Sequence, residues 1–311
     1  MMYRRRSFLL VSLLLAICGA THAAGKQAKQ CGEAGVWVEI LGAGSGELTQ
    51  DFNAPSYLVW VDDRARVLVD AGDGSTGNFV RAGGRFEDLD AVVFTTLEPH
   101  VTSALPAYIA GSLGTPRDRT LPLFGPEGNA GHAGMTEMVQ RLFGEGGVYP
   151  SLGWLFTTRS ASGYRVTTTD IPVNGNRRWA RFGSDRLRLS AIPMDHGGTP
   201  SLAWRVDAGE ISIVFAGPFV HAKQQLVEFA KGADALVVTH AIREITRGDL
   251  RDAYATPSKL GEVAAEAGVR TLVLGARADR TRGRETESRE AITGHFDKYL
   301  IFANDMECWG F

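Results

Sequence analysis

Short apolar runs, rich in Val, Ile and Leu, alternate with turn-forming Gly, Asp and Pro along most of the chain. Runs of this length between turn residues are typical of buried β-strands. In the first half, this pattern predicts strands at 36–42, 56–62, 66–72, 90–96 and 121–126. In the second half, it predicts strands at 186–193, 201–207, 211–217, 234–240, 271–275 and 299–305.

Between these strands, four segments predict helices, at 103–111, 135–144, 221–232 and 256–268. The last has Thr256 as its N-cap, Pro257 in its first turn and Gly268 as its stop. Each half is rich in strands first and then alternates strands with helices. This order predicts an α+β fold in which two sheets pack face to face with helices outside. No linker divides residues 24–311, so we expect one domain, with an irregular insertion near 145–177.

The first 23 residues have the pattern of a signal peptide. A basic start is followed by an apolar run from Phe8 to Cys18 and then by small residues. The run is short for a bilayer span, which favours a cleaved signal and a periplasmic or secreted protein. The motif "RRSFL" at 5–9 resembles a twin-arginine signal, or it is a generic basic start. We expect no transmembrane segment after cleavage.

Composition narrows the possible partners. The formal net charge is −2, and a nucleic-acid-binding protein usually shows a basic excess, so we expect no nucleic-acid partner. Beyond the signal, the only cysteines are Cys31 and Cys308, and no CxxC motif suggests a metal site. In an oxidising compartment such a pair predicts a disulfide that ties the two ends of the chain, if the first and last strands are neighbours. Two separate thiols are the alternative.

Seven segments along the chain carry a resemblance to a known family. They are "LGAGSG", "LVDAGDG", "DAVVFTTLEPHVTSALP", "PMDHGGTPSLAWRV", "ISIVFAGPF", "ALVVTHA" and "VRTLVLGAR". Their order resembles the metallo-β-lactamase superfamily, in its ribonuclease Z and phosphodiesterase-like branch, across residues 36–305. The resemblance implies a four-layer αβ/βα sandwich of two packed mixed sheets. It also implies a hydrolase that holds two metal ions with histidines and aspartates.

The chain departs from that family at most of the implied metal-ligand positions. These positions fall on Thr96, Glu98, His100, Val101, His196, Pro218 and Ala276. Val, Pro and Ala have no side-chain donor, and a threonine hydroxyl is a poor ligand for zinc. The second metal of the family would depend on positions that are mostly lost. We therefore expect no dinuclear centre and no hydroxide bridging two cations.

A single metal remains an alternative. Glu98, His100 and His196 form a two-histidine, one-carboxylate set that can hold one zinc, manganese or iron ion. The competing interpretation is drift after metal loss, with no cofactor.

Four further residues are candidates for the same cleft. His240 matches a family histidine that assists proton transfer, although its glutamate partner is replaced by Ala241. Asp70 is expected to order a turn, while Asp195 is a candidate for orienting a ligand or for replacing one. Arg277 opens a basic run that either forms an anion-binding rim or is a solvated loop.

Three functions fit these observations. The first is an exported, catalytically silent pseudoenzyme whose cleft binds a small ligand or a protein partner. The second is a one-metal hydrolase of phosphodiesters or related esters. The third is a structural protein that uses its outer surface. A retained cleft with ordered aromatic side chains from Tyr149 to Tyr164 would favour the first function. Converging donor atoms would favour the second, and a filled cleft the third.

Overall fold

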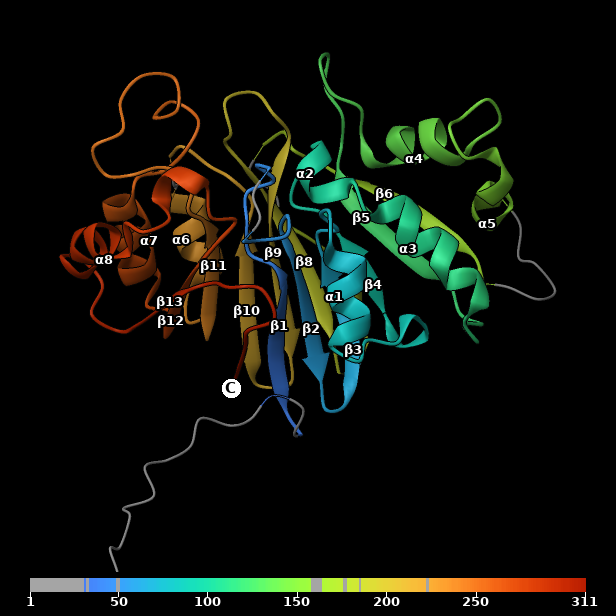
Figure 1. The fold of residues 1–311 in the computed structure, drawn as a ribbon, viewed down its shortest axis with the longest axis horizontal. Helices are drawn as coiled ribbons and strands as arrows, with labels where there is room; N and C mark the ends of the chain where they lie inside the picture. Colours follow the sequence, from blue (N-terminus) through green and yellow to red (C-terminus); the bar gives the residue numbers. More distant parts are fainter. Residues whose placement is uncertain are drawn as a thin grey trace, which may run out of the picture.

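Two sheets of seven strands each form the centre of the protein (Figure 1). The computed structural model describes residues 31, 34–48, 51–157, 164–175, 178–184, 186–221 and 224–311. The predicted signal peptide at 1–23 lies outside the described residues. None of the helices in the described ranges is long and apolar enough to cross a membrane.

The first sheet has the strand order β14-β1-β2-β3-β4-β5-β6. Its strands are β1 (Val36–Gly42), β2 (Ser56–Val61), β3 (Arg64–Val69), β4 (Ala91–Val93), β5 (Leu121–Pro126), β6 (Val166–Ile171) and β14 (Cys308–Gly310). Pairing is antiparallel from β14 to β3 and parallel from β3 to β6. Strand β6 lies inside the range expected to be irregular, and its Thr-rich sequence is typical of a half-exposed strand at the sheet edge.

The second sheet repeats this plan, with the strand order β13-β12-β11-β10-β9-β8-β7. Its strands are β7 (Trp179–Gly183), β8 (Arg188–Met194), β9 (Ser201–Ala208), β10 (Ile211–Ala216), β11 (Ala235–Thr239), β12 (Thr271–Gly275) and β13 (Tyr299–Phe302). Pairing is antiparallel from β7 to β10 and parallel from β10 to β13. In both sheets, the change from antiparallel to parallel pairing falls beside the site described below.

Helices cover the outer face of each sheet (Figure 1). Those packed on the first sheet include α1 (Ser75–Arg81), α3 (Leu105–Gly111) and α4 (Met135–Phe143), and those on the second include α6 (Gln224–Ala230), α7 (Pro257–Ala267) and α8 (Glu285–Thr293). Shorter helical turns are α2 (Pro99–Thr102), α5 (Trp154–Thr157), η1 (Phe86–Asp88), η2 (Ser112–Gly114), η3 (Pro150–Leu152) and η4 (Asp279–Thr281).

Separate hydrophobic clusters fill the spaces between these layers. One cluster lies between the sheets and centres on side chains such as Trp204 and Phe215. A second lies under the helices of the first sheet, and a third lies under those of the second. Three buried interfaces between four layers confirm the predicted αβ/βα sandwich, because each sheet buries both of its faces.

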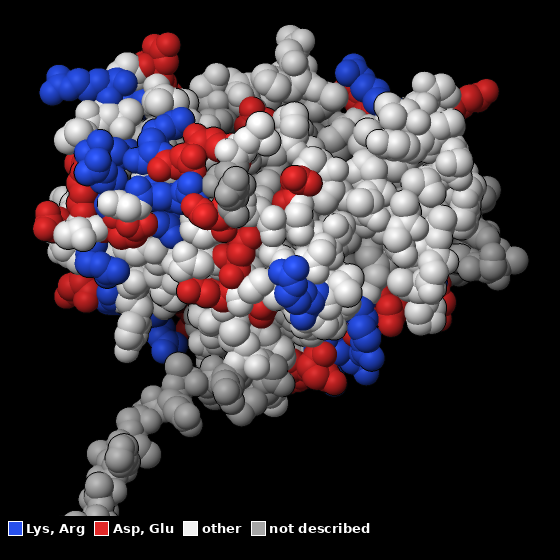
Figure 2. Space-filling model, viewed as in Figure 1, with Lys and Arg blue, Asp and Glu red and all other residues white. Residues whose placement is uncertain are grey.

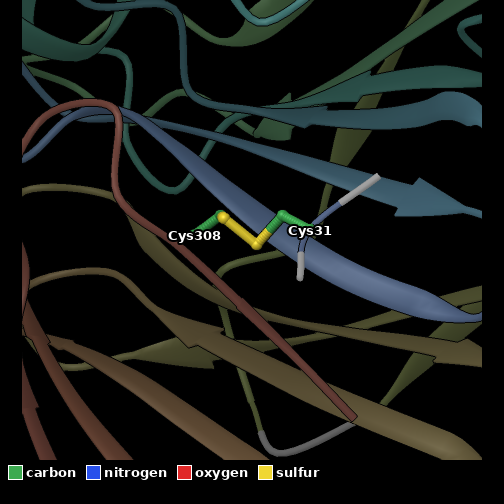
Figure 3. Close-up of a disulfide and its surroundings, with 2 residues drawn as sticks. All are labelled: Cys31 and Cys308. Carbon is green, nitrogen blue, oxygen red and sulfur yellow. A yellow bond between two sulfur atoms is a disulfide. The ribbon is translucent and has the colours of Figure 1, made fainter. Parts of the chain in front are cut away.

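The two ends of the described chain meet in the first sheet. Strand β14 pairs with β1, so that Trp309 lies opposite Val38. A disulfide joins Cys31 to Cys308, with 6.2 Å between their Cα atoms (Figure 3). The predicted disulfide is therefore confirmed, and it forms because the first and last strands are neighbours.

Candidate functional site

A cavity of about 250 Å³ lies where the carboxyl ends of parallel strands from both sheets meet. Residues after β3 and β4 line it from the first sheet, and the ends of β10, β11 and β12 line it from the second. Ligand sites in α/β proteins commonly lie at this edge, because the loops that follow the strands converge there. The cavity is therefore the natural place to look for function.

Asp70 is the most deeply buried acid that lines this cavity. It follows β3 at a φ of 59°, a left-handed conformation that aspartate tolerates better than most residues. Its Oδ1 accepts a hydrogen bond of 2.8 Å from the Thr95 backbone N–H, and its Oδ2 accepts one of 2.7 Å from the Thr95 hydroxyl. Burial raises the pKa of Asp70 to about 7, although the bonds from Thr95 favour the charged form.

Tyr57 crosses from the first sheet to the second beside Asp70. Its phenol oxygen accepts a hydrogen bond of 3.1 Å from the Ala276 backbone N–H. A Cβ on Gly275 would lie only 1.9 Å from that oxygen, so glycine is needed there for Tyr57 to reach. Burial and the nearby Asp70 carboxylate raise the pKa of Tyr57, which keeps its hydroxyl protonated.

Three of the substituted family positions form part of the cavity wall. Val101, Pro218 and Ala276 line it, whereas Thr96 is fully buried and is not among the lining residues. Each of the three lining positions presents a hydrocarbon surface where a metal site would need a donor. These three side chains therefore supply no ligand atom to the cavity.

The three candidate ligands of a single metal are only partly brought together. His100 Nδ1 lies 4.0 Å from Glu98 Oε2, and both residues line the cavity. His196 is buried and is not among the lining residues, and its Nδ1 contacts the Ala253 carbonyl oxygen at 2.9 Å. Burial is the main reason that the pKa of His100 is lowered, and His196 adds to this effect.

These residues do not fit the metal centre that the resemblance implies. Within the described part of the chain, no three His, Cys, Asp or Glu side chains are placed to hold a metal ion. The side chains at Val101, Pro218 and Ala276 cannot supply ligands, so the residues of this site do not support a two-metal mechanism.

The other candidate residues lie outside the cavity lining. His240 is buried, with Nε2 3.0 Å from the Ser288 hydroxyl, and its Nδ1 has no hydrogen-bond partner among the described residues. Burial lowers the pKa of His240 to about 4, so the ring is neutral near pH 7. Asp195 is half-buried directly before His196. Arg277 is buried, forms an ion pair with Glu285 and lies over aromatic rings.

Several lining residues were missed by sequence reasoning. Glu47, Phe215 and Tyr254 are such residues, whereas Arg280, which also lines the cavity, belongs to the basic run that the sequence singled out. Arg280 donates from Nη2 to Glu47 Oε1 at 2.9 Å and from Nη1 to the Ala241 carbonyl at 3.2 Å. The basic run stands out for its charge, but no short-range pattern links it to Glu47, which lies 233 positions earlier.

Charge is unevenly spread over the molecular surface. In the view of Figure 2, Lys and Arg side chains gather over the part with α7 and α8, and few charged side chains lie over α3 and α5. Three arginines of the basic run are paired with acids: Arg277 with Glu285, Arg280 with Glu47, and Arg282 with both Asp51 and Asp279. This pairing leaves less positive charge for an anion-binding rim than the sequence suggests.

Solved structures identify the class of fold. The chain is similar to YhfI from Bacillus subtilis, a metallo-β-lactamase fold protein, with a TM-score of 0.67 and 17% identity over 88% of this chain and 99% of that one. It is also similar to the short form of human tRNase Z, with a TM-score of 0.68 and 14% identity over 88% and 98%. The chain therefore has the metallo-β-lactamase fold.

A third similar structure is a Zn²⁺-bound protein. PqqB from Methylobacterium extorquens matches with a TM-score of 0.61 and 13% identity, over 88% of this chain and 100% of that one. No protein-family model and no curated protein matches the sequence. At these identities the likeness establishes the fold, and function has to be argued from the cavity.

Proposed function

We propose that this protein is an exported, catalytically silent member of the metallo-β-lactamase fold whose cavity binds a small ligand. The observation that carries the proposal is the cavity wall. Val101, Pro218 and Ala276 present hydrocarbon where the resemblance implies metal ligands, and yet the cavity remains. Polar groups elsewhere in the lining can fix the orientation of a ligand. A structural protein without a ligand would have no need of such a cavity.

Export is part of this proposal. It is supported by the basic and apolar pattern of residues 1–23. The disulfide between Cys31 and Cys308 adds support, because disulfides persist in oxidising compartments. A periplasmic or secreted location is consistent with both features.

The alternative is a hydrolase that uses one zinc, manganese or iron ion to cleave a phosphodiester or related ester. The contact of 4.0 Å between Glu98 and His100 favours this alternative. His196 contacts the Ala253 carbonyl through Nδ1, which leaves Nε2 available as a ligand. Among the described residues, however, no three such side chains are placed to hold one ion, and this counts against the alternative.

Metal content decides between the two functions. The protein is purified without chelator, incubated with zinc, manganese or iron(II), desalted and measured by elemental mass spectrometry. We expect far less than one ion per chain, with no difference between wild type and His196→Ala. The matched control is His295→Ala, at an exposed histidine just after the end of α8. One ion per chain that is lost only in His196→Ala, together with phosphodiester hydrolysis, would overturn the proposal.

A further inference from the structure

The cavity carries more acid than base. Asp70, Glu47 and Glu98 line it, and Arg280 is the only arginine or lysine among the described residues that do so. Arg280 already donates to Glu47 and to a backbone carbonyl, so the Glu47 carboxylate balances its charge. His100 also lines the cavity, and its Nδ1 lies 4.0 Å from Glu98 Oε2. Carboxyl groups therefore outnumber basic groups in the lining.

Asp70 has no cationic partner within the described part of the chain. Among the described residues, both of its carboxylate oxygens accept hydrogen bonds from Thr95 only, and no Lys, Arg or His forms an ion pair with it. Each carboxylate oxygen has a second lone pair that can accept a further bond. A buried carboxylate is costly unless a positive group or more donors reach it. The open cavity beside Asp70 is where such a group can enter.

Aromatic rings surround the same space. Tyr57 and Phe215 line the cavity, with ring centroids 5.6 Å apart and planes tilted by 42°. Tyr254 lines it too and is half-buried. The faces of such rings attract organic cations, and combinations of several rings with a carboxylate recognise quaternary ammonium groups.

We propose that the ligand of this cavity is a small organic cation, an alkylammonium or quaternary ammonium compound, held by the Asp70 carboxylate and the rings of Tyr57, Phe215 and Tyr254. This inference rests on the proposed ligand-binding function and gives it a chemical class. The ligand is smaller than a drug-sized molecule, because about 250 Å³ lies below the usual range for such sites. Phosphodiesters are anions and are excluded by the same charges.

The test compares a cation with its neutral isostere. Choline and 3,3-dimethylbutan-1-ol have the same shape and differ in the quaternary nitrogen. Each is titrated into the purified protein by calorimetry, and inorganic phosphate is titrated as the anion. We expect choline to bind about tenfold or more tightly than the neutral alcohol, since the rings and the carboxylate favour only the charged compound. Phosphate should not bind in the cavity.

Two variants assign the binding to the cavity. Asp70→Asn should weaken choline binding about tenfold or more, whereas Asp234→Asn, at a buried carboxylate outside the cavity, should not. If Asp70→Asn does not fold, Tyr254→Leu provides the second route. It should weaken choline binding, and Tyr254→Phe, which keeps a ring, should preserve it.

The possible failures are distinguishable. If the neutral alcohol or phosphate binds as tightly as choline or more tightly, and Tyr254→Leu abolishes that binding, the proposal of a cationic ligand is wrong. The proposal of a ligand-binding cavity would then still stand. If none of choline, the alcohol and phosphate binds, the proposal of a cationic ligand is also wrong. Stoichiometric metal together with phosphodiester hydrolysis would overturn both this inference and the proposed function.

Discussion

The two halves of the chain build the cavity from opposite chemistry. The first half contributes mainly polar side chains, which are Ser45, Glu47, Tyr57, Asp70, Thr95, Glu98 and His100. The second half contributes mainly apolar groups, and its polar lining side chains are Thr239, Tyr254 and Arg280. The sheets that carry these walls nevertheless share one plan of antiparallel and then parallel strands. Equal scaffolds therefore do not imply equal sites.

The clearest pair of positions is Asp70 and Pro218. Asp70 follows β3 and Pro218 follows β10, at the points where each sheet changes from antiparallel to parallel pairing. Both line the cavity. Asp70 is fixed by two bonds from Thr95, so its loss would leave two buried donors without acceptors. Pro218 offers no side-chain donor or acceptor, so the wall of the second half is apolar.

The largest expected effect concerns the covalent link between the halves. Replacing Cys31 and Cys308 together with Ser should lower the free energy of unfolding by about 4 kcal/mol, because the disulfide closes a very long loop of the unfolded chain. Denaturant titration measures the loss. Hydrogen exchange should show that protection falls most in β1 and β14, and equal loss in β11 and β12 would contradict this view of the link.

Removing the carboxylate of the polar wall should have the next largest effect. Asp70→Ala should lower the free energy of unfolding by about 3 kcal/mol, because two buried donors lose their acceptor and alanine is strained at a positive φ. Asp70→Asn should cost less, since it keeps an acceptor and tolerates this backbone conformation. Pro218→Ala is the matched change in the apolar wall. If Pro218→Ala lowers the free energy of unfolding as much as Asp70→Ala does, the polar wall and the apolar wall do not differ in their contribution to stability.

The two halves should also respond to pH in opposite directions. The pKa of Asp70 rises from 3.8 to about 7 on folding, so the native state binds more protons in this window and stability falls as pH rises. The pKa of His240 falls from 6.5 to about 4, so the unfolded state binds more protons and stability rises with pH between these values. The two contributions oppose each other in the wild type.

Variants separate these contributions, each with a slope of up to about 1.4 kcal/mol per pH unit. As the pH rises from about 4 to about 6.5, the free energy of unfolding of Asp70→Asn should increase relative to that of the wild type. Over the same range, that of His240→Gln should decrease relative to the wild type. Urea titrations at several pH values measure both differences. A difference that does not change with pH would show that the replaced group does not titrate between these values in the native state.

The smallest expected effect concerns the ion pair between the two walls. Arg280→Ala removes the contact of 2.9 Å with Glu47 and should lower the free energy of unfolding by less than about 1 kcal/mol, because the pair is partly exposed. The same change leaves Glu47 without this arginine beside the cavity. Choline should then bind as tightly as in wild type or more tightly, and weaker binding would count against the negative cavity.

Strand prediction succeeded where the sequence is most apolar. Strands such as β1, β10 and β12 are buried and nearly continuous in Val, Ile and Leu, so their sequences identify them. Strand β6 contains Thr167, Thr168 and Thr169 and is only half-buried, so it lacks the apolar run by which the other strands were predicted. Helix α1 was also missed, because "STGNFVR" has glycine and few strong helix formers.

Site prediction depended on the order of the motifs. Matching them to a known fold located Pro218 and Ala276, which the structure places at the cavity. Tyr57 and Tyr254 could not be found in this way, because residues 197 positions apart become neighbours only through the packing of the two sheets. His240 shows the converse, since its motif suggested a catalytic role and the fold buries it against Ser288.

The bond between Cys31 and Cys308 also makes the protein a covalent circle, since it spans 277 positions of the sequence. One protease cut at any peptide bond within the circle opens the backbone without separating the pieces. Such a nicked molecule should run as a single band without reductant and as two fragments with it. This chain can therefore survive one proteolytic cut as a single covalent molecule that holds both walls of its cavity.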